Sequence, residues 1–152
     1  MAYNPIKGFY SKGVVNARLK AIWTTLTALG VPKADGATFV IGTEAANVIN
    51  VGVTLVDSEV ATVASQQVVR VFVSDSATGV GIAATAPSSA TAVGTDGVIL
   101  VTDVAGKVYT VESAATGLFD LDVTETGTDT FYLVVVLPNG KTVVSGAITF
   151  AA

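Results

Sequence analysis

Carboxylates are the only side chains of this sequence whose types and spacing could support catalysis. The 152 residues include no histidine and no cysteine, which removes the usual general base, the thiol nucleophile and the common zinc ligands. Asp120 and Asp122 would share one strand face, and Glu125 and Asp129 flank the following turn. Paired acids can hydrolyse glycosides or bind calcium. The spacing of a calcium-binding loop is absent, so the solvent face of a half-buried strand is the simpler interpretation.

Other catalytic motifs are missing as well. The sequence has no dinucleotide-binding glycine motif, no phosphate-binding loop and no nucleophile elbow. The serines at 74, 76, 88 and 89 lie in turn-like segments, and no base stands near them in the sequence to activate them. We therefore expect a protein that is not an enzyme, with no catalytic residue, no cofactor and no metal site.

The composition indicates a β-rich chain that does not cross a membrane. Valine, threonine and alanine are abundant, and the 15 glycines suit many turns. The apolar runs have the length of strands, and none reaches the roughly 18 residues of a membrane-spanning helix. The N-terminus has lysines but lacks the continuous apolar run of a signal peptide.

Charge divides the chain into two parts. Residues 1–34 carry five basic residues and no acidic one, whereas residues 35–152 carry three basic and twelve acidic residues. Net charges of +5 and −9 indicate an appendage with its own electrostatic role on an acidic body. Five bases in 34 residues are too sparse for a typical nucleic-acid site, so an acidic protein surface is the expected target, on another subunit or on this body.

The first 33 residues are expected to form an arm and one helix that serve attachment or oligomerisation. Glycine and proline interrupt residues 1–13 too often for a helix. Between 14 and 29, apolar residues recur at spacings of four and three, and Gly30 and Pro32 end the pattern. This stripe could form a short coiled coil or pack on the body. It consists of Val15, Leu19, Ile22, Leu26 and Leu29.

Aromatic and basic side chains are interleaved along the same segment. Such residues can stack on nucleic-acid bases, are enriched in protein interfaces, or can pack within the chain. The low charge density argues against nucleic acid. We expect the basic residues to attract an acidic partner and the aromatic ones to be buried as anchors. The candidates are Tyr3, Lys7, Phe9, Tyr10, Lys12, Arg18, Lys20 and Trp23.

Beyond Pro32 the pattern predicts short strands separated by glycine-rich turns, which is typical of a β-sandwich. In 137–141 the sequence Leu-Pro-Asn-Gly-Lys predicts a hairpin, because Asn-Gly tolerates the positive φ of a type I′ turn. The Ala-, Ser- and Thr-rich segment 84–95 is expected to be a mobile surface loop. The predicted strands cover 38–41, 48–56, 60–64, 67–75, 80–84, 97–102, 107–112, 118–124, 130–137 and 142–150.

From residue 66 onward the sequence resembles the immunoglobulin-like domains of tailed-bacteriophage virion proteins and, more loosely, those of bacterial surface adhesins. The resemblance rests on QQVVRVFVSD in 66–75 and on VTD…AG, TGLFDLDVTETGTDTFYL and VLPNGKTVVSGAI within 94–151. These phrases look like capsid decoration or head-fibre proteins. The resemblance implies an immunoglobulin-like fold, binding to an assembled virion and an outward-projecting domain, and it brings no catalytic motif.

These observations predict a mostly β protein, an immunoglobulin-like β-sandwich in 34–152 preceded by an N-terminal arm and one α-helix in 1–33. The expected function is that of a non-enzymatic virion structural protein on the outside of a phage capsid, made in the host cytoplasm. Its expected partner is the major capsid protein or another virion protein. The chain is also expected to form a homo-oligomer, with a trimer favoured. The alternatives are a phage tail protein, of the tube or accessory kind, and a carbohydrate-binding adhesin module.

Overall fold

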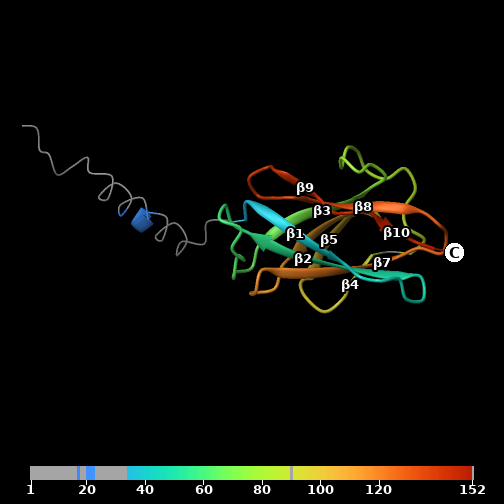
Figure 1. Cartoon of the computed structure of the whole chain (residues 1–152), viewed down its shortest axis with the longest axis horizontal. Coiled ribbons are helices and arrows are strands. Elements are labelled where there is room, and N and C mark those ends of the chain that lie inside the picture. Colours follow the sequence, from blue (N-terminus) through green and yellow to red (C-terminus); the bar gives the residue numbers. More distant parts are fainter. Residues whose placement is uncertain (1–16, 18–19, 23–33, 90, 152) are drawn as a thin grey trace, which may run out of the picture. The chain divides into compact units, whose positions relative to one another are not determined.

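The computed structural model describes residues 17, 20–22, 34–89 and 91–151 (Figure 1). The chain divides into two units between residues 33 and 34. In the first unit, Ala17 and 20–22 are helical and exposed, and they belong to the helix predicted for 14–29. The remainder of that helix and the predicted arm lie outside the described residues. Within the described ranges, no helix is long and apolar enough to span a membrane.

Two antiparallel sheets make up the second unit, so the prediction of a mostly β chain is confirmed (Figure 1). The first sheet contains, in spatial order, β1 (Gly36–Ile41), β2 (Val48–Val56), β7 (Leu118–Thr124) and β4 (Ala92–Val93). The second contains, in spatial order, β10 (Ile148–Thr149), β8 (Thr130–Val136), β3 (Val68–Ser74), β6 (Val108–Glu112) and β5 (Val98–Val104). β9 (Thr142–Val144) also pairs with β8, on the side away from β3.

One hydrophobic core lies between the buried faces of the two sheets. Strands β2, β3, β7 and β8 alternate, so that every second side chain turns inward. Leu121 of the first sheet and Val71 and Leu133 of the second are completely buried. Phe131 and Phe150 meet edge to face with their ring centroids 6.4 Å apart. Burial of each large aliphatic or aromatic side chain stabilises the fold by about 1.5–3 kcal/mol, which explains why this alternation dominates the architecture.

Two predicted strands are wrong for a backbone reason. Segment 80–84 is not a strand, because Gly79 immediately before it and Gly81 within it have positive φ values of 69° and 82°. Segment 60–64 contributes only an isolated bridge between Val56 and Thr62, since Val60 also has a positive φ, of 63°. Such φ values turn the chain out of the extended conformation.

Two further differences concern strand ends. The predicted strand 142–150 is divided into β9 and β10, because the Ser145 hydroxyl accepts a hydrogen bond from the Leu133 N–H and donates one to the Gly146 carbonyl. Conversely, the segment predicted as the loop 84–95 contains the short strand β4, which pairs with β7.

The hairpin predicted at 137–141 is present, but its turn differs from the expected type. Only Gly140 has a positive φ, and the Leu137 carbonyl accepts a hydrogen bond from the Gly140 N–H. This is a three-residue loop with glycine in the left-handed position. The two-residue turn with positive φ at both positions is instead formed by Ala46 and Asn47, between β1 and β2.

Candidate functional site

The residues predicted to bind a partner or to oligomerise belong mostly to the part of the chain that is not described. Lys20 and Ile22 are the exceptions, and both are exposed on the helix. Ile22 exposes 56% of its surface, and its part in an apolar stripe stays a prediction. The others lie outside the described residues, and their roles stay predictions: Tyr3, Lys7, Phe9, Tyr10, Lys12, Val15, Arg18, Leu19, Trp23, Leu26 and Leu29.

The start of the second unit is fastened to the body over two consecutive residues. Ala34 is buried in the hydrophobic core, although it immediately follows the boundary between the units. The backbone N–H of Asp35 donates to the carbonyl of Val56 at 2.9 Å, which continues the pairing of β1 with β2. The first two residues of the second unit are therefore fixed on its body by packing and by a ladder hydrogen bond.

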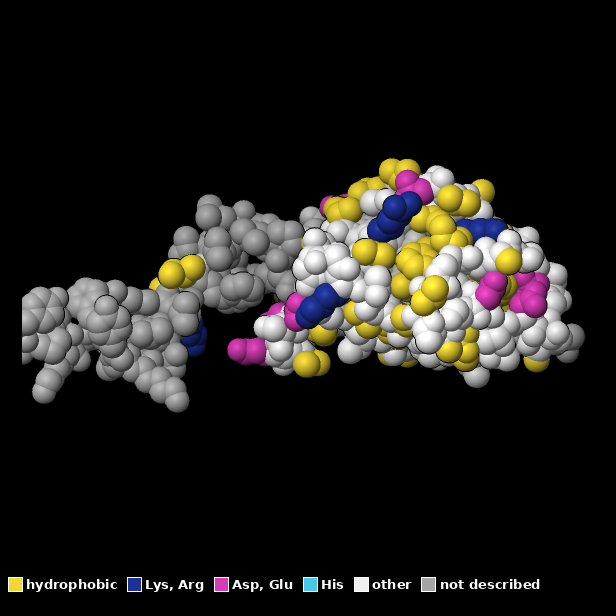
Figure 2. Space-filling model, turned by 90° about the horizontal axis from the view of Figure 1, so that it is seen from above, with side chains coloured by type: hydrophobic (Ala, Val, Ile, Leu, Met, Phe, Trp, Pro, Cys, Tyr) yellow, Lys and Arg dark blue, Asp and Glu magenta, His cyan; other side chains and the backbone are white. Residues whose placement is uncertain are grey.

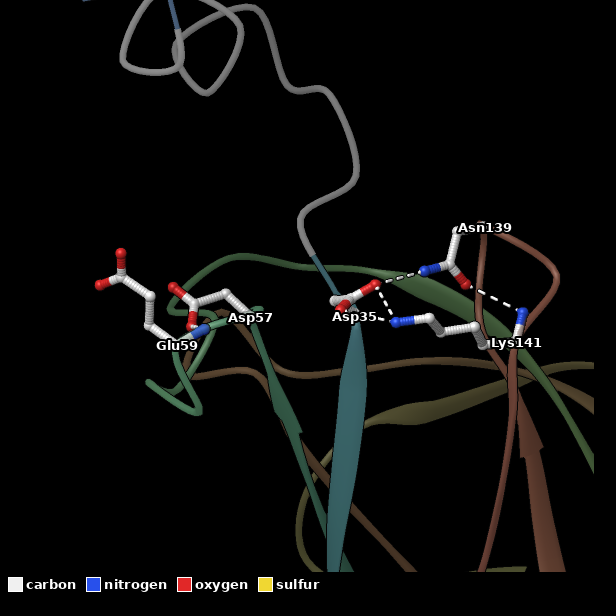
Figure 3. A network of polar contacts seen from close by, with 5 residues as sticks. All are labelled: Asp35, Asp57, Glu59, Asn139 and Lys141. Atoms are coloured by element: carbon white, nitrogen blue, oxygen red, sulfur yellow. Dashed lines mark hydrogen bonds and ion pairs between the residues drawn. The ribbon is translucent and has the colours of Figure 1, made fainter. Parts of the chain in front are cut away.

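The Asp35 side chain adds a polar clamp to this junction (Figure 3). Both of its carboxylate oxygens lie 2.7 Å from Nζ of Lys141, and Nδ2 of Asn139 donates to Oδ1 at 2.8 Å. Oδ1 of Asn139 in turn accepts from the backbone N–H of Lys141. The tip of the β8–β9 hairpin thus grips the first residues of the unit. The ion pair is partly exposed, so we assign it at most about 1 kcal/mol of stability.

A second acidic turn lies beside this junction (Figure 3). Oδ1 of Asp57 accepts hydrogen bonds from the backbone N–H groups of Glu59 and Ala61, which closes the turn after β2. The turn holds Val60 at its positive φ, a conformation that is rare for a β-branched residue, and leaves it exposed. This end of the body therefore presents two carboxylates and one strained aliphatic side chain next to the start of β1.

Asp120, one of the acids considered for catalysis, holds a loop instead. Its carboxylate accepts hydrogen bonds from the backbone N–H groups of Thr95 and Asp96 and, at 2.7 Å, from Nδ2 of Asn50. Burial alone would raise the pKa of Asp120, but these hydrogen bonds together lower it. A Cβ on Gly94 would stand 2.0 Å from Oδ2, so only glycine lets the carboxylate approach this loop. An anion held in this way is a poor general base.

Glu125 fastens the same connecting segment further upstream. The Ser88 hydroxyl donates to Oε1 at 2.6 Å, the Ser88 N–H donates to Oε2, and the Gly127 N–H donates to Oε1. The hydroxyl of Ser88 is the largest cause that lowers the pKa of Glu125, against the opposing effect of burial. Glu125 and Asp120 thus bind the backbone of the segment 84–95 at Ser88 and Thr95, and the mobility predicted for this segment stays a prediction.

The remaining acidic candidates form no catalytic arrangement. Asp122 accepts one hydrogen bond from Asn50, and Asp129 borders an open depression of about 250 Å³ together with Asp75. Oδ2 of Asp75 already accepts from the Ala84 N–H at 2.7 Å. No group of three or more potential metal-ligating side chains occurs among the residues that the structure describes. Asp75 therefore holds a backbone segment, and Asp122 binds a neighbouring side chain on its strand face.

Exposed aliphatic side chains are the second notable surface feature. Figure 2 shows one face of the molecule, on which hydrophobic side chains lie exposed between charged ones. They are concentrated on the edge strand β5, where Val98, Leu100, Val101 and Val104 are all exposed. Alternation alone did not predict this exposure, because the register of the strand predicted for 97–102 shifts between Ile99 and Val101.

Two features of the described residues can thus carry a function: a fastened junction at the start of β1, and an aliphatic edge on β5. Both lie on the surface and are suited to contacts between macromolecules. Neither the family models nor the curated proteins compared with the sequence give a match, so the interpretation rests on this geometry.

Proposed function

We propose that this chain is a non-enzymatic structural protein of a tailed-bacteriophage virion that binds the outside of the capsid as a decoration or head-fibre protein. Residues 1–33 would attach it, and residues 34–152 would project as an immunoglobulin-like β-sandwich. The observation that carries this proposal is the junction at Ala34 and Asp35, where a basic segment joins an acidic body at a point held by packing and by the Lys141 clamp.

The strand order supports the immunoglobulin-like part of the proposal. In such domains, strands A, B, E and D form one sheet and strands G, F and C form the other. The order β1-β2-β7-β4 corresponds to A-B-E-D, and β9 or β10 followed by β8 and β3 corresponds to G-F-C. The β5–β6 hairpin departs from this pattern. In the sequence it lies between β4 and β7, which correspond to D and E, and in space it extends the second sheet beyond β3.

Charge supports the attachment of the protein through its first segment. Residues 1–34 have five basic side chains and no acid, while the remainder has twelve acids and three bases. A shell that displays acidic groups would attract the first segment and repel the body, which orients the protein before contact. The proposed contacts are those of the basic and aromatic candidates named above, with Lys20 as the described example.

The fastened junction would give such attachment a mechanical consequence. A body joined by a long unpaired linker could be bound and still rotate freely. Here Ala34 is buried and Asp35 is bonded through both its backbone and its side chain, so the second unit is ordered from its first residue onward. This is what a projecting decoration protein requires.

Co-sedimentation with capsids that lack this protein tests the proposal. We expect saturable binding of the full chain that weakens at high salt, because salt screens exposed charges. Replacement of Lys7, Lys12, Arg18 and Lys20 by glutamine should weaken binding at low salt by at least about tenfold, since each removed charge contributes to the attraction. For a single charge, the test variant is Lys12→Gln and its matched control is Lys107→Gln, which removes a lysine of the body. Only Lys12→Gln should weaken binding.

Two outcomes would count against this function. Absence of binding at either salt concentration would exclude the capsid as the partner. Binding that is unchanged in the fourfold variant would exclude the basic segment as the electrostatic anchor.

A further inference from the structure

Two bulges place the valines of β5 on one face of the second sheet. Val98, Val101 and Val104 pair with Glu112, Thr110 and Val108 of β6, and the register shifts once between Ile99 and Val101 and once between Thr102 and Val104. Each shift adds one residue to β5, so valines three positions apart point to the same side. Because residues that pair directly point to the same face, this side is opposite to Tyr109 and Val111, which face the core. Val108 lies on the outer side but is also buried, so the exposed part of this side extends from Val104 along β5 toward Val98.

The same outer face continues across β6 onto β3. Val68 pairs with Glu112, and Arg70 pairs with Thr110. We call this surface the valine face and define it by Val68, Val98, Val101 and Val104, together with the Arg70 and Glu112 between them. The four valines expose 44–55% of their surfaces. Exposed aliphatic side chains grouped at the edge of a sheet favour association, since water is released when they are covered.

Three charged side chains determine which partner fits the valine face. Nε of Arg70 lies 3.6 Å from Oδ2 of Asp103, which also accepts a hydrogen bond from the Thr110 hydroxyl at 3.3 Å. Glu112 has no ion pair among the described residues, although it lies between Val68 and Val98. A partner that covers the valines must therefore offer a cation to Glu112, because a carboxylate buried without one is costly.

We propose that the valine face is an isologous interface with a second copy of this chain. The two-fold axis lies between the facing valine faces of the two copies and passes midway between Arg70 and Glu112. It brings each Arg70 against Glu112 of the second copy. The valines of one face then cover the valines of the other. Self-complementarity of this kind is the requirement of a two-fold interface, and the valine face meets it with one cation and one unpaired anion.

A second copy fits this surface better than a basic peptide or an unrelated acidic protein does. A second copy brings a cation to Glu112 and carboxylates to Arg70, whereas a strongly basic segment would bring cations against Arg70 as well as against Glu112. The association is independent of the helical stripe and of capsid binding, so that its failure would not affect the proposed function.

Sedimentation velocity of the full chain over a wide concentration range provides the test, in the absence of capsids. We expect a monomer–dimer equilibrium. Arg70→Glu and Glu112→Arg should each raise the dissociation constant by at least about tenfold, because like charges then face each other. The double variant Arg70→Glu/Glu112→Arg should restore dimerisation, which a merely local effect on folding would not do.

A pair of matched lysine substitutions tests the apolar part. Val101→Lys places a charge in the valine face and should abolish the dimer. Val40→Lys is the control, because Val40 exposes 73% of its surface on β1 of the other sheet. Circular dichroism should confirm that both variants keep their strands.

Three results would overturn the proposal. The first is a chain that stays monomeric at every concentration. The second is a dimer that persists in Val101→Lys, and the third is a double variant that remains as weak as the single ones. An association that survives Val101→Lys but is lost in Ile22→Lys would assign self-association to the helical stripe instead.

Discussion

Strands β7 and β5 have the same length and a similar valine- and aspartate-containing composition, yet they use their side chains in opposite ways. In β7 every second residue is buried, and the outward Asp120 and Asp122 accept hydrogen bonds. In β5 only Ile99 is shielded from solvent, and the valines lie on the surface.

Their neighbours explain the difference. β7 lies between β2 and β4, so its register is fixed from both sides, and a shift by one residue would expose its buried face. β5 ends its sheet and has β6 as its single paired strand, so extra residues can be accommodated. Alternation in a sequence therefore predicts burial well for an interior strand and poorly for an edge.

Truncation in the two strands should give the largest contrast. Leu121→Ala in β7 removes a completely buried side chain and should lower the free energy of unfolding by about 2–5 kcal/mol. Leu100→Ala in β5 is the control for the same substitution at an exposed position, with an expected change within about 0.5 kcal/mol. Urea unfolding followed by circular dichroism measures both. Similar losses at the two positions would contradict the assignment of β5 as an exposed edge.

Substitution of the two outward acids of β7 should lower the free energy of unfolding by unequal amounts, with a smaller contrast than that between Leu121 and Leu100. Asp120→Ala leaves the N–H groups of Thr95 and Asp96 without their acceptor and should cost about 1–3 kcal/mol in unfolding free energy. Asp122→Ala removes only the second bond of Asn50 and should cost less than about 1 kcal/mol. Amide exchange at residues 95 and 96 should accelerate in the first variant and stay unchanged in the second.

Acid should weaken β7 and the segment that it holds, but not β5. The pKa values of Asp120 and Glu125 are lowered below their ordinary values of 3.8 and 4.5 in the folded state. The two groups therefore stabilise the fold above those ordinary values, and this contribution is lost as the pH falls through the lower folded values. Unfolding free energy should decrease below about pH 4.5, and Asp120→Asn with Glu125→Gln should flatten that decrease. An equally steep pH dependence in the double variant would assign the acid sensitivity to other carboxylates.

Deletion of Leu100 should have only a small effect on stability. Its neighbours Ile99 and Val101 pair with Val111 and Thr110 and can keep these partners when the extra residue is removed. We expect the free energy of unfolding to change by less than about 1 kcal/mol. A loss as large as that of Leu121→Ala would show that the bulge is required for the sheet to form, and would remove the contrast between the two strands.

Sequence-based reasoning located most strands because burial follows local alternation. Phe119, Leu121 and Val123 were separated correctly from Asp120 and Asp122, and the structure buries the first three. Segments 60–64 and 80–84 misled the same reasoning, since their valines and alanines suggest strands while positive φ values prevent them. The sequence contains the relevant glycines at 79 and 81, so this error had a visible signal.

The candidate site was harder to predict than the fold. Asp35 lies more than one hundred residues before Asn139 and Lys141 in the sequence. Nothing in the local sequences around these residues indicates that they meet. The grip of Asp120 on residues 95 and 96 has one local sign, the glycine at 94 that leaves room for the carboxylate. A contact between distant segments depends on the register of two strands, and single-sequence patterns do not determine it.

The sequence by itself determined the β-rich class, the alternation of the interior strands and the charge difference between the first 34 residues and the rest, because composition, period and charge are local properties. Only the tertiary structure decided that Glu125 and Asp120 fasten the loop before β5, that Lys141 clamps the start of β1, and that two bulges turn the valines of β5 outward. The physical reason is that each of these outcomes depends on which strands become neighbours and in which register, and that choice is made by burial of the whole core.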